Sequence, residues 1–239
     1  SIARARELVL PALHAAVDAI ADERMRLVAG YQLGWCEADG TPVDGGGGKM
    51  IRPTLAILSA EAAGGLSTAG VPGGVALELV HNFSLLHDDI MDRDTERRHR
   101  PTGWVAFGEG QAILGGPAML PAAVEVLMAD PACSPRTVPQ LLGTVQHLIS
   151  GQSADLALEC RRQVTLAEVL DMEIGKTAAL LSSASSIDAV AVGAPAHVVE
   201  ALAGYGHRMG LAFQLVDDVL GVTGDPSVTG KSASSDVRT

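Results

Sequence analysis

The sequence predicts an all-α fold in which long helices pack as a bundle around a central site. Alanine and leucine dominate the chain, and the alternation of β-branched residues that marks strands is rare. In each long segment, apolar residues recur at steps of three and four, as on one face of a helix. Clusters of Gly, Pro and Asp separate these segments. The 239 residues, 47% of them hydrophobic, suffice to bury one large core, and we expect a single domain over residues 1–239.

The expected helices follow one another with polar breaks between them. They cover residues 51–63, 73–92, 137–159, 165–185 and 196–221. The break before the first of them reads "EADGTPVDGGGG" and the break before the third reads "ADPACSPR". Several of the helices are apolar on most sides, which is typical of helices at the centre of a bundle. We therefore expect a site between facing helices.

The overall composition argues against several classes of protein. The net charge of −11 argues against a general nucleic-acid-binding protein, since the phosphate backbone calls for a basic face. The cysteines, Cys36, Cys133 and Cys160, are far apart without CxxC spacing, which argues against a disulfide framework or zinc site and fits a cytoplasmic location. We find no signal peptide and no apolar run of the roughly twenty residues that a bilayer span requires. We expect a chain that binds no nucleic acid and crosses no membrane.

A first cluster of aspartates ends the expected helix 73–92. Asp88 and Asp92 are four residues apart, so their carboxylates lie one turn apart on the same face, with Asp89 beside them. Like charges at this spacing repel, and the helix dipole adds to the cost at a C-terminus. A divalent cation removes this cost, and hard oxygen ligands without His or Cys favour Mg²⁺. The alternative is a solvated helix end.

A second acidic cluster repeats this design on the expected helix 196–221. Asp217 and Asp218 follow an apolar stretch, and Asp225 comes seven residues after Asp218. Gly221 stands where a further carboxylate would complete an i, i+4 pair. Two such clusters on separate apolar helices could face each other and hold several metal ions around one polyphosphate. The occurrence of both clusters makes a solvated surface the weaker interpretation of either.

An arginine-rich loop follows the first cluster. Arg97 and Arg98 suit phosphate oxygens, because the guanidinium fork matches their geometry. Arg93 and Arg100 are attributed to charge balance against neighbouring acids.

A second basic element precedes the first expected helix. In "GGGGKMIRP", Lys49 and Arg52 stand three residues apart at a glycine-rich helix start, which offers bare amides and two cations to an anion. The full P-loop pattern is absent, so a nucleotide is not implied. His81 lies two helical turns before the first aspartate, on the same face, although a lone helical histidine is more often structural.

Several motifs stand in a characteristic order. They are GKMIRP (48–53), ELVHNFSLLHDDIMD followed by RRHRPT (78–102), GQSADL (151–156), GKTAALL (175–181) and GLAFQLVDDVLGVTGDPSVTGK (210–231). In this order they resemble the trans-isoprenyl (polyprenyl) diphosphate synthase family, and its geranylgeranyl diphosphate synthases in particular. The resemblance implies an isoprenoid-synthase-type helical bundle around a deep central cavity, three Mg²⁺ ions and a homodimer. It implies a prenyltransferase that condenses isopentenyl diphosphate with an allylic prenyl diphosphate by ionisation, condensation and elimination.

The resemblance also assigns roles to individual residues. The first metal motif is matched by Asp88, Asp89 and Asp92, and the second by Asp217 and Asp218. The allylic diphosphate contacts are matched by Arg97 and Lys176, with Thr177, Gln214 and Lys231 nearby. The isopentenyl diphosphate pocket is matched by Lys49, Arg52, His81 and Arg98. The residues on which catalysis is expected to depend are Asp88, Asp89, Asp92, Arg97, Lys176 and Asp217.

The chain also departs from the family pattern. Gly221 replaces the last aspartate of the second metal motif, so the metal role of that position is lost or passes to water. Pro117 stands where the family commonly has aspartate. The chain stops at Thr239, soon after the second motif, so we expect the C-terminal helices of relatives to be absent from this domain.

Two residues before the first cluster are expected to set product length. Phe83 and Ser84 stand five and four residues before Asp88, at the expected floor of the cavity. One bulky and one small residue there resemble the geranylgeranyl-type enzymes, so we expect a C20 product, with C15 as the next choice. Ordinary core packing of Phe83 is the alternative.

Two rival functions stay open. A class I terpene cyclase shares the fold and the first motif, but it needs no isopentenyl diphosphate pocket and tends to steer cations with aromatic faces, which are scarce here. A non-catalytic regulatory subunit of a heteromeric prenyl synthase would lose an aspartate motif, and Gly221 is a partial loss of that kind.

Overall fold

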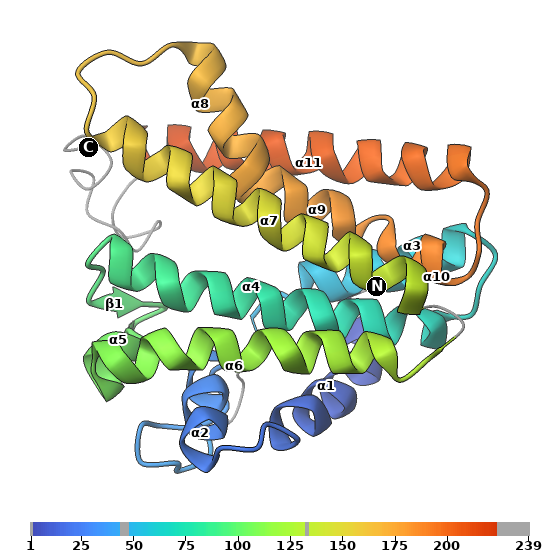
Figure 1. The fold of residues 1–239 in the computed structure, drawn as a ribbon, viewed down its shortest axis with the longest axis horizontal. Helices are drawn as coiled ribbons and strands as arrows, with labels where there is room; N and C mark the ends of the chain where they lie inside the picture. Colours follow the sequence, from blue (N-terminus) through green and yellow to red (C-terminus); the bar gives the residue numbers. More distant parts are fainter. Residues whose placement is uncertain (1, 44–47, 132–133, 224–239) are drawn as a thin grey trace.

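The computed structural model describes residues 2–43, 48–131 and 134–223, with side chains described up to residue 220. Over these residues the chain is an all-α bundle, as the sequence predicts, and its strands form one short hairpin (Figure 1). The helices are α1 (Ile2–Asp18), α2 (Glu23–Gln32), α3 (Ile51–Ala62), the 3₁₀ turn η1 (Ser67–Gly70), α4 (Val71–Met91), α5 (Gly103–Phe107), α6 (Glu109–Met128), α7 (Ser134–Glu159), α8 (Leu166–Glu173), the π-helical turn η2 (Ile174–Ala178), α9 (Ala179–Ala184), α10 (Ile187–Ala191) and α11 (Ala196–Thr223). The hairpin pairs β1 (Glu96–Arg97) with β2 (Arg100–Pro101).

Most of the expected helices are confirmed with bounds that differ by a few residues. Those at 51–63, 73–92, 137–159 and 196–221 are α3, α4, α7 and α11. The expected helix 165–185 is interrupted, because the backbone forms the π-helical turn η2 after α8 before it resumes as α9.

Three longer helices were not expected from the sequence, namely α1, α2 and α6. α1 contains Pro11, and α6 contains Pro117 and Pro121. A proline inside a helix removes one hydrogen bond and reads as a breaker in the sequence. Here the surrounding packing keeps both helices continuous.

The central helix of the bundle is α4. Val75, Leu77, Leu79 and Leu86 are fully buried along it. α6 packs antiparallel along α4, and α1 and α3 contact it as well (Figure 1). This is the apolar central helix that the sequence predicts. The first acidic cluster therefore stands at the end of a rigid core element.

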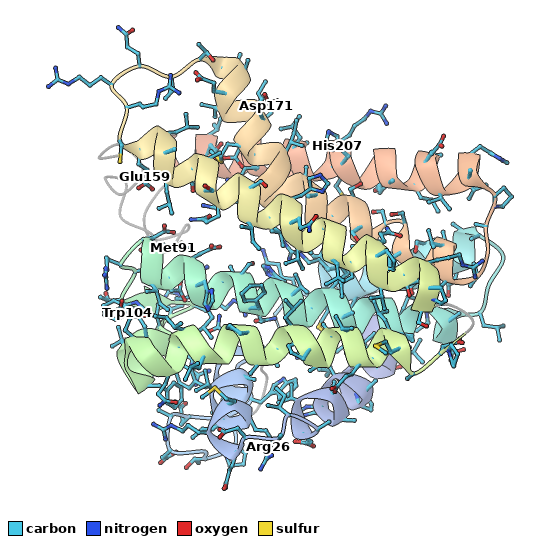
Figure 2. The ribbon with its side chains drawn as sticks, in the orientation of Figure 1. Arg26, Met91, Trp104, Glu159, Asp171 and His207 are labelled. Atoms are coloured by element: carbon cyan, nitrogen blue, oxygen red, sulfur yellow. The ribbon has the colours of Figure 1, made fainter. Side chains whose placement is uncertain are left out.

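The C-terminal ends of α4, α7 and α11 lie toward the same end of the bundle in Figure 1. Figure 2 marks two of these ends by Met91 on α4 and Glu159 on α7, with Trp104 of α5 below them. Charged residues near these ends are thereby brought into one region, although they are far apart in the sequence.

One helix of the described residues, α6, is long and apolar enough to cross a bilayer by length and composition alone. From the sequence we expected no apolar run long enough for a bilayer span. In the bundle α6 packs along α4, with Ala112, Met119 and Ala123 fully buried. A core helix meets the same criterion, and this packing accounts for its apolar composition.

Candidate functional site

A cavity of about 580 Å³ lies between the start of α3, the end of α4, the hairpin, η2 and α11. Its acidic side chains are Glu78, Asp88, Asp92, Asp94 and Asp217. Its basic side chains and histidine are Lys49, Arg52, His81, Arg97, Arg98 and Lys176. Its neutral polar side chains include Ser84, Thr177 and Gln214. The two acidic clusters, on different helices, thus share one hollow with the predicted cations.

The α4 acids at the cavity wall are partly dehydrated. Burial raises the pKa of Asp88 to about 6, with Lys176 acting in the opposite direction and Asp92 adding to the rise. Burial also raises the pKa of Asp92, again against the charge of Lys176. Carboxylates that repel each other and are short of water gain most from a cation placed between them. This pair therefore has the electrostatic character of metal ligands.

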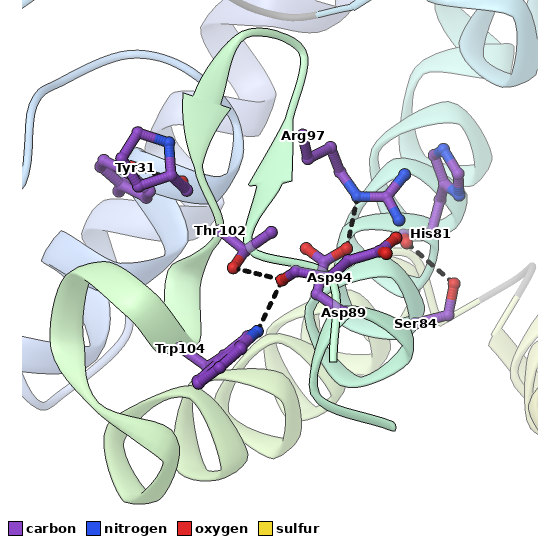
Figure 3. A network of polar contacts seen from close by, with 9 residues as sticks. Tyr31, His81, Ser84, Asp89, Asp94, Arg97, Thr102 and Trp104 are labelled. Carbon is purple, nitrogen blue, oxygen red and sulfur yellow. Dashed lines mark hydrogen bonds and ion pairs between the residues drawn. The ribbon is translucent and has the colours of Figure 1, made fainter. Parts of the chain in front are cut away.

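Unlike Asp88 and Asp92, Asp89 does not line the cavity. It is fully buried, and its Oδ1 accepts a hydrogen bond from Arg97 Nε at 2.6 Å (Figure 3). Its Oδ2 is buried without a hydrogen-bond partner in the described part of the chain. Burial raises the pKa of Asp89, while the Arg97 guanidinium opposes the rise. Asp89 therefore orients Arg97, which lines the cavity, and keeps one oxygen unpaired.

A two-residue turn presents the second arginine. Arg98 and His99 connect β1 to β2 with φ of 56° and 61°. Positive φ at both positions is typical of a type I′ hairpin turn, and non-glycine residues adopt this conformation only at a cost. Arg97 before the turn and Arg98 within it both line the cavity. Backbone strain of this kind is typical of functional sites.

The hairpin is held to α2 and to the segment after it by contacts that were not predicted from the sequence. Arg100 Nη2 donates to the Cys36 carbonyl at 2.6 Å, and the guanidinium lies 4.3 Å from the centre of the Tyr31 ring. The Tyr31 hydroxyl donates to the Pro101 carbonyl at 2.6 Å. Arg100 was attributed to charge balance, and it does pair with Glu37 at 3.3 Å, but its contacts to backbone and ring go beyond that role. No motif marks Tyr31, and only the fold brings it to the hairpin.

Further cations line the cavity at the start of α3 and on the hairpin. Burial lowers the pKa of Arg52 to about 10, with Glu78 opposing the change and Arg98 adding to it. Burial, together with the neighbouring arginines, holds the pKa of His81 well below its usual range, so that its ring is neutral. Lys49 lines the same cavity. Lys49 and Arg98 are exposed, so an anion from solvent can reach this group of cations and offset their mutual repulsion.

The π-helical turn η2 approaches α7 through two glycines. A Cβ at Gly175 would lie 2.8 Å from Gly151 Cα, and a Cβ at Gly151 would lie 2.6 Å from the Gly175 carbonyl carbon. Neither position therefore accepts a side chain without a shift of backbone. Lys176 follows at once, and its Nζ pairs with Asp155 on α7. π-Helical turns within helices frequently mark functional sites, and this one carries the predicted lysine.

Two acids beside Lys176 were not predicted. Asp155 belongs to the GQSADL segment, so its motif was recognised but its ion pair was not. Glu173, the last residue of α8, is buried, and burial with the added charge of Asp218 raises its pKa to about 7. Its Oε2 has no hydrogen-bond partner in the described part of the chain. The one sequence signal for Glu173 is its position one turn before Lys176.

Gln214 on α11 joins η2 to the second acidic cluster. Its Oε1 accepts from Thr177 Oγ1 at 2.9 Å, and its Nε2 donates to Asp218 Oδ1 at 2.8 Å. Both Asp217 and Asp218 are exposed, but only Asp217 lines the cavity. The second cluster therefore faces the site mainly through Asp217.

Gly221 does not end α11, which continues to Thr223. Asp225 and Lys231, which the sequence analysis associates with this site, lie outside the described residues.

The acids that converge fit a magnesium ion shared with a substrate. In the described part of the chain, no group of three or more His, Cys, Asp or Glu is close enough to hold a metal by itself. The carboxylates that share the cavity are Asp88 and Asp92 on α4 and Asp217 on α11. Mg²⁺ commonly takes one or two carboxylates and completes its six ligands with waters and substrate phosphates. The donor set suits that mode of binding.

A second cavity of about 270 Å³ lies between α4 and α7 and meets the first at Asp88. From α4 it is lined by Phe83, Ser84, His87, Asp88 and Met91. From α7 it is lined by Leu148, Ile149, Gln152, Ser153 and Leu156. Phe83 and Ser84 thus lie in a hollow adjoining the acids, as the sequence predicts. The polar cavity and the more apolar one therefore adjoin each other and share Asp88 and Lys176 in their walls.

Comparison with known proteins identifies close similarities. The sequence model described as polyprenyl synthetase matches residues 41–239. The chain is 48% identical over 235 residues to (2E,6E)-farnesyl diphosphate synthase of Mycobacterium tuberculosis, covering 98% of this chain and 65% of that protein. It is 42% identical over 236 residues to geranylgeranyl diphosphate synthase of the same species, covering 98% of this chain and 67% of that protein. The chain thus spans about two thirds of the length of these curated relatives.

The fold of the chain is also similar to that of solved structures. The crystal structure of polyprenyl synthetase from Streptomyces coelicolor matches with a TM-score of 0.92 and 50% sequence identity, covering 99% of this chain and 70% of that one. This match confirms the expected class of helical bundle.

Proposed function

The chain belongs to the polyprenyl synthetase family, and from this premise we propose that it is a Mg²⁺-dependent prenyltransferase. It condenses isopentenyl diphosphate with an allylic prenyl diphosphate to give a short-chain product of C15 or C20. One observation carries the proposal: Asp88 and Asp217, from different helices, line the same cavity as the cations. Relatives named for both product lengths support the class of product.

The allylic diphosphate binds at the acidic end of the cavity. Asp88, Asp92 and Asp217 would hold the magnesium ions, and Lys176 and Arg97 would contact the diphosphate oxygens. When bound, Mg²⁺ neutralises the negative charge that grows on the departing diphosphate. Arg97 is oriented for this contact by its hydrogen bond to Asp89.

Isopentenyl diphosphate binds at the cations of the α3 start and the hairpin, which are Lys49, Arg52 and Arg98, with neutral His81 beside them. A second group of cations in the same cavity favours condensation of two diphosphates over cyclisation of one. This is the reason to prefer a synthase to a class I terpene cyclase.

Departure of the diphosphate leaves an allylic cation, and the alkene of isopentenyl diphosphate attacks it. The proton lost in the last step passes to the released diphosphate, so that no protein base is required. Water would quench the cation, and the apolar side chains of the second cavity, such as Phe83, Leu148 and Leu156, keep it away from the growing chain.

The test is an incubation of the purified chain with Mg²⁺, isopentenyl diphosphate and dimethylallyl, geranyl or farnesyl diphosphate in turn. Products are then identified by mass. We expect a linear C15 or C20 diphosphate, and loss of turnover in Asp88→Ala. A cyclic hydrocarbon would assign the chain to the cyclases. No product from the chain alone, but turnover on addition of an active partner, would assign it to the regulatory subunits.

We also propose that the protein is a homodimer. The adjacent helices α6 and α7 expose large apolar side chains, including Leu114, Met128 and Leu142. Contiguous apolar surface on a folded protein supports burial against a partner. Light scattering should give twice the chain mass of 24.6 kDa, and the mass of one chain would contradict the proposal.

A further inference from the structure

His87 directly precedes the first acidic cluster, and none of the roles above uses it. Its ring lines the second cavity and also contacts α6. We propose that His87 is a positioning residue, which fixes Phe83 as a wall of the second cavity and so limits the prenyl chain length that the cavity accepts. The inference rests on the proposed function for the nature of the occupant.

The contact begins with a proline inside α6. In an α-helix the N–H of residue 117 donates to the carbonyl of residue 113, but Pro117 has no N–H. The Ile113 carbonyl is thereby left without its helical donor, and His87 Nε2 lies 3.0 Å from it. Because a carbonyl only accepts, Nε2 carries the proton. Pro117 thus selects one tautomer and one orientation of the His87 ring.

The oriented ring then holds Phe83, which stands one helical turn earlier on α4. The two ring centroids are 5.1 Å apart with planes at 81°, an edge-to-face arrangement. Gly116 on α6 leaves space for both rings, because a Cβ there would lie 2.8 Å from Phe83 Cδ2 and would also overlap His87. Between His87 and Gly116, Phe83 has no room to swing away from the cavity toward α6.

The experiment measures chain-length preference by binding, so that turnover is not needed. Dissociation constants for unreactive prenyl thiodiphosphates from C10 to C25 are measured with Mg²⁺ by calorimetry on the full 239-residue chain. In the wild type, affinity should rise with the length of the prenyl chain. It should fall at the first chain that is too long to fit in the cavity.

His87→Leu removes the donor at similar volume, and His87→Gln keeps an N–H within reach of the Ile113 carbonyl. We expect His87→Leu to tighten binding of the first rejected length by about tenfold, as one more isoprene unit becomes buried. His87→Gln should keep the wild-type preference.

Pro117→Ala supplies the missing helical N–H and should shift the preference in the direction of His87→Leu. Pro121→Ala, at the exposed second proline of α6, should leave it unchanged.

An unchanged preference in His87→Leu, or an equal shift in His87→Gln, overturns the inference, as does a wild type that binds no prenyl chain. A wild type that binds the series but forms no product contradicts the prenyltransferase and not the role of His87. If His87→Leu does not fold, the test is made on the wild type and Pro117→Ala instead. Long-range ¹H–¹⁵N spectra show which imidazole nitrogen of His87 carries the proton. A proton on Nε2 that is partly lost in Pro117→Ala supports the inference, and a proton on Nδ1 overturns it.

Discussion

Arg97 Nε lies 2.6 Å from Asp89 Oδ1, and this ion pair joins the hairpin to the central helix of the bundle. The Asp89 side chain is 1% exposed and the Arg97 side chain 29% exposed, so the arginine reaches the cavity while its partner stays in the core. A buried carboxylate that loses its partner is strongly destabilising. We therefore expect the pair both to stabilise the fold and to orient Arg97 toward the substrate. Substitutions can separate these two roles.

Replacement of Arg97 by glutamine should affect stability and activity together. R97Q leaves Asp89 buried and unpaired, which should lower the free energy of unfolding by about 3 kcal/mol. It also removes a cation from the diphosphate, which should lower kcat by about 10²-fold. In R97Q/D89N the buried charge is gone, so urea unfolding should recover most of the lost stability while steady-state kcat stays low. Recovery of kcat along with stability would show that Arg97 acts through the fold alone.

Removal of the Tyr31 hydroxyl should loosen the hairpin without disturbing the acids. Y31F loses the hydrogen bond to the Pro101 carbonyl but keeps the ring beneath Arg100. The hairpin carries both Arg97 and Arg98, but Arg97 is also held by its hydrogen bond to Asp89 on α4. We therefore expect the loss to act mainly through Arg98, so that the KM for isopentenyl diphosphate rises about three- to tenfold, with kcat nearly unchanged. Tyr205→Phe, at an exposed position on α11, serves as the control. A fall in kcat with constant KM would contradict the assignment of Arg98 to this substrate.

The sequence predicted the acidic part of the site better than its supports. Asp88, Asp92 and Asp217 are recognisable because like charges at the ends of apolar helices have a local cost that only a ligand removes. Asp89 was grouped with them, yet it faces Arg97, because a helix turns each successive side chain by about 100°. Tyr31 gives no such signal, since its contact spans 70 residues and depends on how α2 packs.

The same holds for the fold: helices with a clear local pattern were predicted, and elements that depend on tertiary packing were missed. Segments with uninterrupted apolar periodicity, such as α4 and α7, were predicted to within a few residues. α6 was missed, because Pro117 and Pro121 break the local pattern while burial against α4 keeps the helix intact. The π-helical turn η2 was missed too, since the local sequence does not show that Gly175 lies against Gly151 of another helix.

That glycine contact makes a matched pair of substitutions in α7 informative. In Gly151→Ala the new Cβ would lie 2.6 Å from the Gly175 carbonyl carbon, so η2 must move away and the Lys176–Asp155 pair must break. We expect a loss of about 2 kcal/mol in unfolding free energy and a fall in kcat of about 10²-fold. Gly143→Ala, with nothing within 4 Å of its Cβ, should be neutral or slightly stabilising. Full activity in Gly151→Ala would show that the position of Lys176 does not depend on this contact.

Glu173 predicts how the stability of the metal-free chain depends on pH. Its pKa is about 7 in the folded protein against an ordinary 4.5, chiefly because of burial, with Asp218 adding to the rise. Between these values the folded state binds more protons than the unfolded state, so this group lowers stability as pH rises from about 4.5 through 7.

The glutamine amide in E173Q resembles the protonated acid and does not titrate. E173Q should therefore match the wild type near pH 5 and exceed it by about 1–3 kcal/mol at pH 8, measured by urea unfolding in EDTA. Glu200→Gln, on the exposed face of α11, controls for the loss of one negative charge. An E173Q chain no more stable than the wild type at pH 8 would mean that Glu173 finds a partner or water that offsets its burial.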